Sequence, residues 1–157
     1  MRKRSYYKKR EHKGDPEQNR VDVGRFINYL MKEGKKTVAE KNFYDALTKI
    51  QKATKEDPIK VFEKALENAT PMLEVVSRRI GGANYQIPRD IRPERQFFLA
   101  THWIIQAARS RKGKPMAQKL AEELIAAAKN EGVAIKKKLD THRMAEANRA
   151  FASLLRR

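Results

Sequence analysis

The chain contains no cysteine, only 8% aromatic residues and a single tryptophan. Without cysteine there is no disulfide framework, no thiolate metal site and no cysteine nucleophile, and a reducing compartment suits such a chain. No apolar run approaches the roughly 20 residues that span a bilayer, and the basic N-terminus lacks the apolar segment of a secretory signal. We therefore expect a soluble, cytoplasmic protein without a membrane partner.

Patterns that support catalysis are also scarce. The histidines His12, His102 and His142 lie far apart, and no metal-ligand spacing links them. We expect His102 to be packed and His142 to cap a helix or contact phosphate. Glu122 and Glu123 are neighbours on a predicted helix and point in different directions, which disfavours a paired-carboxylate site. The sequence predicts no enzyme, no metal site, no cofactor and no small-molecule substrate.

Positive charge is the dominant feature that is present. The chain has 36 basic and 19 acidic residues, which leaves a net charge of +17. Residues 2–13 carry seven basic and one acidic side chain, residues 75–95 five and two, and residues 136–157 seven and two, so these segments supply +14. Residues 14–74 hold eleven of each sign and resemble an ordinary solvated surface. A localised excess of this kind indicates a polyanionic partner.

The N-terminal residues 1–13 have almost no aliphatic content, so they cannot bury a core. We predict a basic arm that stays disordered until it binds a polyanion. Tyr6 and Tyr7 could stack on bases or sugars, the alternative being a disordered tail with incidental tyrosines. The cations expected to bind phosphate here are Arg2, Lys3, Arg4, Lys8, Lys9 and Arg10.

Residues 14–157 are predicted to form a single, mainly α domain with six helices. Three short helices come first. Asp22 is placed to cap the first, and Thr37 opens the second in a capping box with Glu40. Asp57 followed by Pro58 begins the third. The predicted core stripes are Val23, Phe26, Ile27, Leu30 and Met31, then Ala39, Phe43, Ala46, Leu47 and Ile50, then Phe62, Ala65, Leu66 and Ala69.

The stretch between residues 75 and 95 contains five arginines and no lysine. Arginine offers a planar fork that matches phosphate and stacks on bases, so this choice indicates recognition of a shaped polyanion. Gly81 and Gly82 form the kind of two-residue loop that closes a β-hairpin. We expect one protruding hairpin at about residues 72–90, between the third and fourth helices, with Arg78 and Arg79 on a stiff ribbon.

Three more helices are predicted after the hairpin. Pro93 begins a largely apolar helix in which Phe97, Phe98 and Trp103 should be buried. Pro115 begins the fifth, and the sixth should follow Asp140 or Thr141, with Met144, Ala147, Phe151 and Leu154 at helical spacing. The cations at the carboxyl end of the fourth helix are Arg109, Arg111, Lys112 and Lys114.

Two kinds of nucleic-acid ligand fit this pattern. Short helix pairs joined by glycine-containing turns are compatible with a DNA-reading helix-turn-helix protein. Charge spread over an arm, a hairpin and a tail instead favours several backbone segments of a folded RNA. A regulatory protein that represses an mRNA, or that binds an acidic partner, remains an alternative.

Three blocks of sequence give a more specific indication. The run from Ser77 to Pro88, continued by Arg92 and Pro93, resembles the central hairpin of the bacterial small-subunit ribosomal protein S7 family. The stretch from Asp22 through Lys35 and Lys36 to Ala46 is similar to that family's N-terminal signature, and residues 142–151 are similar to its C-terminal helix. The resemblance spans about residues 15–151.

The resemblance implies a six-helix fold with a β-ribbon that binds the 3′ major domain of 16S rRNA and nucleates assembly of the subunit head. It also implies a place at the subunit interface near the decoding centre, exit-site tRNA and mRNA, in contact with small-subunit proteins nine and eleven. The ribbon residues that would face RNA are Arg78, Arg79, Gly81, Gly82 and Tyr85. The further phosphate-binding residues would be Lys35, Lys36, Arg92, Arg95, Arg109, Arg111, Lys114 and Arg143.

Overall fold

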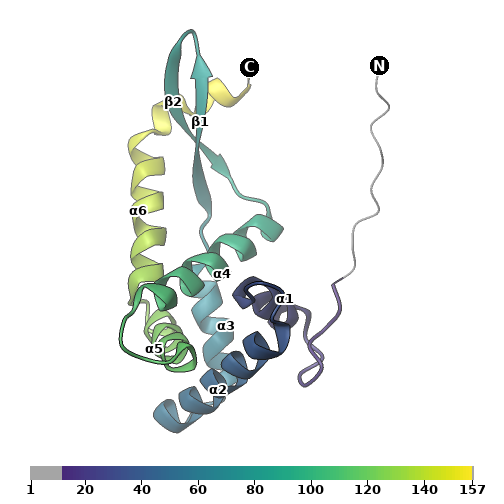
Figure 1. Ribbon diagram of the computed structural model, residues 1–157. Helices are drawn as coiled ribbons and strands as arrows, with labels where there is room; N and C mark the ends of the chain where they lie inside the picture. The colour runs from purple at the N-terminus through teal and green to yellow at the C-terminus, as the bar shows by residue number, and fades with distance from the viewer. Residues whose placement is uncertain (1–11, 157) are drawn as a thin grey trace, which may run out of the picture.

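The computed structural model describes residues 12–156 and shows a helical body from which a two-stranded antiparallel hairpin protrudes (Figure 1). The elements in chain order are α1 (Val21–Leu30), α2 (Lys36–Thr54), α3 (Pro58–Ala69), β1 (Leu73–Ile80), β2 (Ala83–Asp90), α4 (Pro93–Ser110), α5 (Met116–Ala128), α6 (Val133–Ala147) and a C-terminal 3₁₀ helix (Arg149–Arg156). The predicted fold class, mainly α with six helices and a hairpin between the third and fourth, is confirmed. No helix within residues 12–156 is both long and apolar enough to cross a membrane.

Three phenylalanines form the centre of the core of the body. Phe26, Phe43 and Phe62 come from α1, α2 and α3, are completely buried, and have ring centroids 5.1–5.4 Å apart. The apolar stripes predicted for these three helices are buried apart from Met31, which packs at the edge. Such a cluster removes three large apolar surfaces from water and fixes the helices relative to one another.

The predicted burial of α4 was right in part. Trp103 is buried with Ile104 and the small residues of the same helix. Phe97 and Phe98 are only half-buried, because they lie near the start of α4, beside α1 at the edge of the body. The predicted burial of these two rings was therefore wrong.

The helix caps show where sequence reasoning succeeded and failed. Asp57 caps α3, and its Oδ1 accepts a hydrogen bond of 3.0 Å from the backbone N–H of Ile59. Asp22 is not a cap, because α1 begins one residue earlier and the carboxylate pairs with Arg20. Thr37 is not a cap either, since α2 begins at Lys36 and no side chain caps its first turn.

The hairpin has the two-residue loop that its glycines predicted. Pairing runs from Leu73 opposite Asp90 to Ile80 opposite Ala83. Gly81 and Gly82 have φ values of +55° and +89°, a left-handed conformation that glycine adopts without the steric penalty of a Cβ atom. The result is a regular ribbon that carries its tip well away from the helical body (Figure 1).

The sixth helix begins earlier than predicted. Gly132, with φ of +95°, precedes Val133 as the first residue of α6, so the predicted start at Asp140 or Thr141 was wrong. Only four residues of α6 are buried, so apolar residues recur only weakly at helical spacing in this part of the sequence. Met144 and Phe151, expected in a core stripe, are 48% and 37% exposed. Ala147 is exposed as well.

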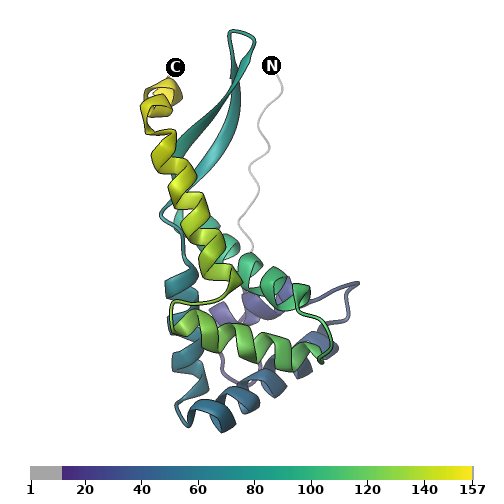
Figure 2. The ribbon, with the colours of Figure 1, turned by 90° about the vertical axis from the view of Figure 1, so that its left-hand side faces the viewer.

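The helix α6 rises beside the hairpin (Figure 2) and contacts both strands. His142 joins the two elements, because its Nε2 accepts a hydrogen bond of 3.1 Å from the backbone N–H of Met72, directly before β1. Accepting this bond requires the neutral ring nitrogen. Burial, and secondarily the positive charge of Lys138, lower the pKa of His142, which favours that neutral form.

Candidate nucleic-acid interface

A groove of about 1140 Å³ lies between the base of the hairpin, the start of α4 and the end of α6. The helix α6 contacts both the hairpin and α4, so residues distant in sequence lie close together in this region (Figure 2). Its charged lining consists of Arg89, Arg92, Arg95, Arg149, Glu74, Asp90 and Glu146. Arg92 and Arg95 were predicted from the sequence as phosphate-binding residues, whereas Arg89 and Arg149 contributed only to the charge of their segments.

Glu74 organises two of these arginines. Its carboxylate is nearly buried and accepts hydrogen bonds from the Nη2 and Nε of Arg89 at 2.6 and 2.9 Å. The Nε of Arg95 approaches the other oxygen at 3.4 Å. One carboxylate thus holds two guanidinium groups, which leaves a local positive excess in fixed orientation.

Arg92 and Arg143 are less constrained. Arg92 is the exposed residue before the first turn of α4, and Arg143 is exposed on α6. Within residues 12–156, neither side chain forms an ion pair with a carboxylate of the chain. An exposed guanidinium of this kind keeps its donors available for an external phosphate.

The ribbon presents its own cations. Arg78 and Arg79 are exposed on β1, opposite Tyr85 and Asn84, and across the part of the chain that the structure describes they have no acidic partner. Tyr85 has a neighbour that the sequence did not indicate, because the ring of Phe151 contacts it edge-on at a centroid distance of 5.3 Å. The C-terminal 3₁₀ helix is thereby packed against β2.

The exposed tip gives close backbone access. A Cβ atom built on Gly81 or Gly82 would meet no other atom within 4 Å. A ligand can therefore approach the main chain at this loop without first displacing a side chain. The predicted ribbon site is thus accessible at its tip, whereas the C-terminal 3₁₀ helix covers part of β2.

A second group of cations lies at the other end of α4. Lys32, Lys35 and Arg109 line a depression of about 280 Å³. Arg109 also donates a hydrogen bond of 3.0 Å to the carbonyl of Leu30, so it connects α4 to the end of α1. Lys35 and Lys36 are exposed and pair with nearby glutamates. An 18-residue helix is about 27 Å long, so the groove and this depression are separated by roughly that distance.

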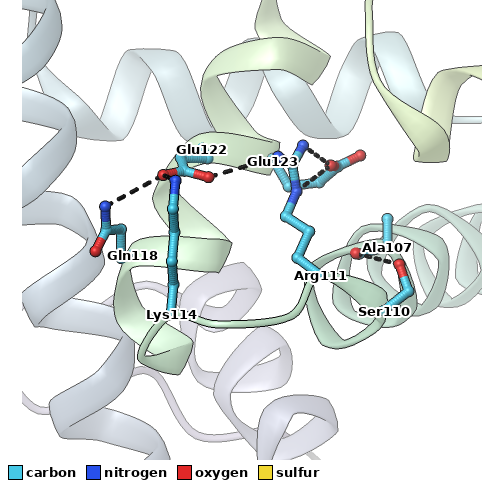
Figure 3. A network of polar contacts seen from close by, with 7 residues as sticks. All are labelled: Ala107, Ser110, Arg111, Lys114, Gln118, Glu122 and Glu123. Atoms are coloured by element: carbon cyan, nitrogen blue, oxygen red, sulfur yellow. Dashed lines mark hydrogen bonds and ion pairs between the residues drawn. The ribbon is translucent and has the colours of Figure 1, made fainter.

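Arg111 and Lys114 belong to an internal polar network (Figure 3). The Nη2 of Arg111 lies 2.6 Å from Oε2 of Glu123, whose side chain is completely buried. The other oxygen of Glu123 accepts the backbone N–H of Ala134 at 3.1 Å, near the start of α6. Lys114 donates to Glu122 at 2.5 Å, and this bond is the main reason that the pKa of Glu122 is lowered. Both cations are engaged by the chain's own carboxylates.

The structure therefore brings the predicted site residues together in separate groups. Arg92 and Arg95 line the groove, Arg78 and Arg79 lie on the ribbon, and Lys35 and Arg109 line the depression. Arg143 is exposed on α6 outside these groups, and the network of Figure 3 holds Arg111 and Lys114. The cations predicted for the arm, from Arg2 to Arg10, lie outside the described residues. No group of three or more metal-ligating side chains that could hold a metal ion occurs within residues 12–156.

A helical body that presents a cationic groove and an arginine-bearing ribbon has the features of a nucleic-acid-binding protein. Comparison with known proteins narrows the class. Residues 1–149 match the family model described as "Ribosomal protein S7p/S5e". The chain belongs to this family, and it is a structural constituent of the small ribosomal subunit.

Curated relatives agree over most of the chain. The small ribosomal subunit protein uS7 of Thermotoga petrophila is 56% identical over 138 residues, which cover 88% of this chain and 89% of the relative. The proteins of the same name from Chelativorans sp. and Marinobacter nauticus are 51% and 50% identical over 152 residues, with 97% of both chains covered in each comparison. The resemblance found in the sequence blocks is confirmed by these matches.

Proposed function

We propose that this protein binds the 3′ major domain of 16S rRNA as a primary binding protein and nucleates assembly of the subunit head. The observation that carries the proposal is the groove between the hairpin, α4 and the end of α6. Its four arginines are Arg89 of β2, Arg92 directly before α4, Arg95 of α4 and Arg149 of the 3₁₀ helix. Membership in a ribosomal protein family supplies the class of ligand. The choice of this rRNA domain follows from the family resemblance.

The groove provides a physical means of binding a folded RNA. The fixed guanidinium groups of Arg89 and Arg95, and the exposed one of Arg92, offer donors to phosphates that approach from different directions. Each neutralised phosphate releases condensed counterions, which drives association and makes it sensitive to salt. Basic residues of the arm would then add further contacts to phosphates.

The cations do not contribute equally in this mechanism. Arg78, Arg79, Arg92 and Arg143 are exposed and free of intramolecular ion pairs over residues 12–156, so we assign them the main phosphate contacts. Arg111 is committed to a buried carboxylate and would contribute less. The exposed pairs of Lys35, Lys36 and Lys114 are weak enough to exchange for a phosphate.

The placement of the protein on the subunit is the second part of the proposal. The ribbon would lie at the subunit interface near the decoding centre, beside exit-site tRNA and mRNA, with small-subunit proteins nine and eleven as neighbours. Its support is the projection of the ribbon tip away from the body (Figure 1), together with Arg78 and Arg79 close to that tip, which have no acidic partner among residues 12–156. A short, stiff ribbon of this kind can reach a second ligand while the body stays bound to rRNA.

A salt titration tests the rRNA assignment. Binding to a transcript of the 3′ major domain should weaken about a thousandfold or more between about 50 and 200 mM salt if six to ten phosphates are contacted. Replacing Arg92, an exposed arginine that lines the groove, by alanine should lower the affinity and should lower the salt slope by about one. The matched control is Lys64→Ala, an exposed cation on α3 outside the groove.

The outcome that contradicts the proposal is equally definite. A flat salt response, or tighter binding to duplex DNA than to the transcript at equal salt, would exclude the rRNA mechanism. An equal loss in the Lys64→Ala control would show that the groove has no special part in binding.

A further inference from the structure

One face of α4 carries a column of planar side chains. Arg95, Phe98, His102 and Gln106 follow one another at spacings of three or four residues, so they lie on the same side of the helix. The ring of Phe98 stacks on His102 with a centroid distance of 5.4 Å and an interplanar angle of 13°. The guanidinium of Arg95 lies over Phe98, 5.0 Å from its centroid. The column continues to Gln106, whose Nε2 lies 3.0 Å from Nε2 of His102.

The column is a surface feature. Phe98 and His102 are half-buried, and Arg95 and Gln106 are exposed. Phe97 and Tyr29 pack against the hydrophobic core. Phe98 contacts the ring of Tyr29 edge-on, with a centroid distance of 5.4 Å, but within residues 12–156 it is not among the residues packed against that core. Because Arg95 and His102 cover the ring of Phe98 within the column, a ligand would extend the stack at one of the column's ends.

The column begins at the groove and is held rigidly. Arg95 lines the groove and is fixed both by Glu74 and by the face of Phe98. Arg25 lies beside it, with its guanidinium 4.5 Å from the centroid of Phe97. The Nε of Arg25 is buried and has no hydrogen-bond partner within residues 12–156. Two guanidinium groups, those of Arg95 and Arg25, therefore lie against aromatic rings at this end of α4.

We propose that the column of Arg95, Phe98 and His102 binds unpaired RNA bases by stacking, while phosphates of the same strand are held by the arginines of the groove. Unstacked bases bind aromatic rings and arginine planes in this way, and every base has a face suited to it. The exposed edges of His102 and Gln106 add polar groups for a base edge. The proposal rests on the proposed rRNA-binding function and adds a contact to bases.

The test distinguishes contacts to bases from contacts to phosphates. The probes are a fluorescein-labelled 12-mer of adenosine and a 12-mer of abasic ribose phosphates with the same charge. The intact protein should bind the adenosine probe more tightly, by about 5- to 150-fold for each stacked base. Phe98→Leu and His102→Ala should move that ratio toward one, whereas Phe98→Tyr, which keeps the ring, should preserve it. The salt slope should not change in these variants, because no phosphate contact is lost.

Folding and location are checked in the same samples. Trp103 is the one tryptophan of the chain and is buried, so its fluorescence and the thermal melt report whether each variant is folded. Should Phe98→Leu unfold, His102→Ala gives the same comparison at the neighbouring ring of the column. A 5-iodouridine probe should crosslink to the peptide spanning residues 95–106.

Two results would overturn the proposal. One is equal affinity of the intact protein for the two probes. The other is an unchanged ratio in folded Phe98→Leu and His102→Ala proteins, which would place any stacking elsewhere, such as at Tyr6 and Tyr7. Arg92→Ala distinguishes this proposal from the proposed rRNA-binding function. It should lower the salt slope of binding while leaving the ratio of the affinities for the two probes unchanged.

Discussion

The contact between Arg111 and Glu123 allows a structural role to be distinguished from a phosphate-binding role. Replacing Arg111 by methionine leaves the completely buried carboxylate of Glu123 without its charged partner. Removing one member of a buried ion pair costs about 3 to 5 kcal/mol. Because the Arg111 side chain is 34% exposed, we expect the lower end, about 3 kcal/mol. For a chain of this size that loss lowers the melting temperature by about 6–12 °C.

Urea and thermal melts of a double-mutant cycle measure this effect. The pair Arg111→Met with Glu123→Leu removes both charges and should recover all but about 1 kcal/mol, the remaining loss being the hydrogen bond from Ala134. The control is Lys114→Met, whose partner Glu122 is partly exposed, and its cost should stay below about 1 kcal/mol. A loss below about 1 kcal/mol for Arg111→Met would refute the reasoning and return Arg111 to the candidates for phosphate binding.

Three further predictions concern the body and the tether of the hairpin. Trp103→Ala should cost roughly 3–5 kcal/mol in denaturant melts through lost burial and a cavity; a cost below about 1 kcal/mol would show that Trp103 is not part of the core. Asp57→Ala should cost about 1 kcal/mol because the N–H of Ile59 loses its acceptor, and Asp57→Asn, which keeps an acceptor, should be nearly neutral in the same melts. The folded state lowers the pKa of His142 below its ordinary value, so its stabilising contribution is complete above about pH 6.5 and is lost as the pH falls through the folded-state value. Melts of the protein and of His142→Asn between pH 8 and 5 should therefore converge toward acid pH, and parallel curves would show that His142 is not the titrating group.

Local chemistry made several elements predictable. Two consecutive glycines between arginine-bearing strands permit the left-handed turn that closes the hairpin, and the φ values of Gly81 and Gly82 confirm it. Asp57 followed by Pro58 specifies a helix start by capping and by a fixed backbone angle. The phenylalanines of the first three helices fall at helical spacing, and this was enough to place them in the core.

Errors arose where local signals were ambiguous. Asp22 and Thr37 have good capping side chains, yet each lies one residue inside its helix. The helix α6 buries too few residues to show a strong period. Ala134 and Ile135 at its start belong to the core of the body, whereas much of the rest of α6 lies beside the hairpin or faces solvent. Phe98 has the hydrophobicity of a core residue, but its position on α4 places it in a surface stack.

The sequence alone determined the class of fold, the hairpin and the localised excess of positive charge, because these depend on turn residues, apolar spacing and counts of ionisable groups. Only the tertiary structure decided which cations are available to a ligand. Arg111 and Arg92 are indistinguishable as letters in a basic segment, but packing brings Glu123 against the first and leaves the second exposed. The availability of a charge is set by its neighbours in space, and these come from elements far apart in the chain.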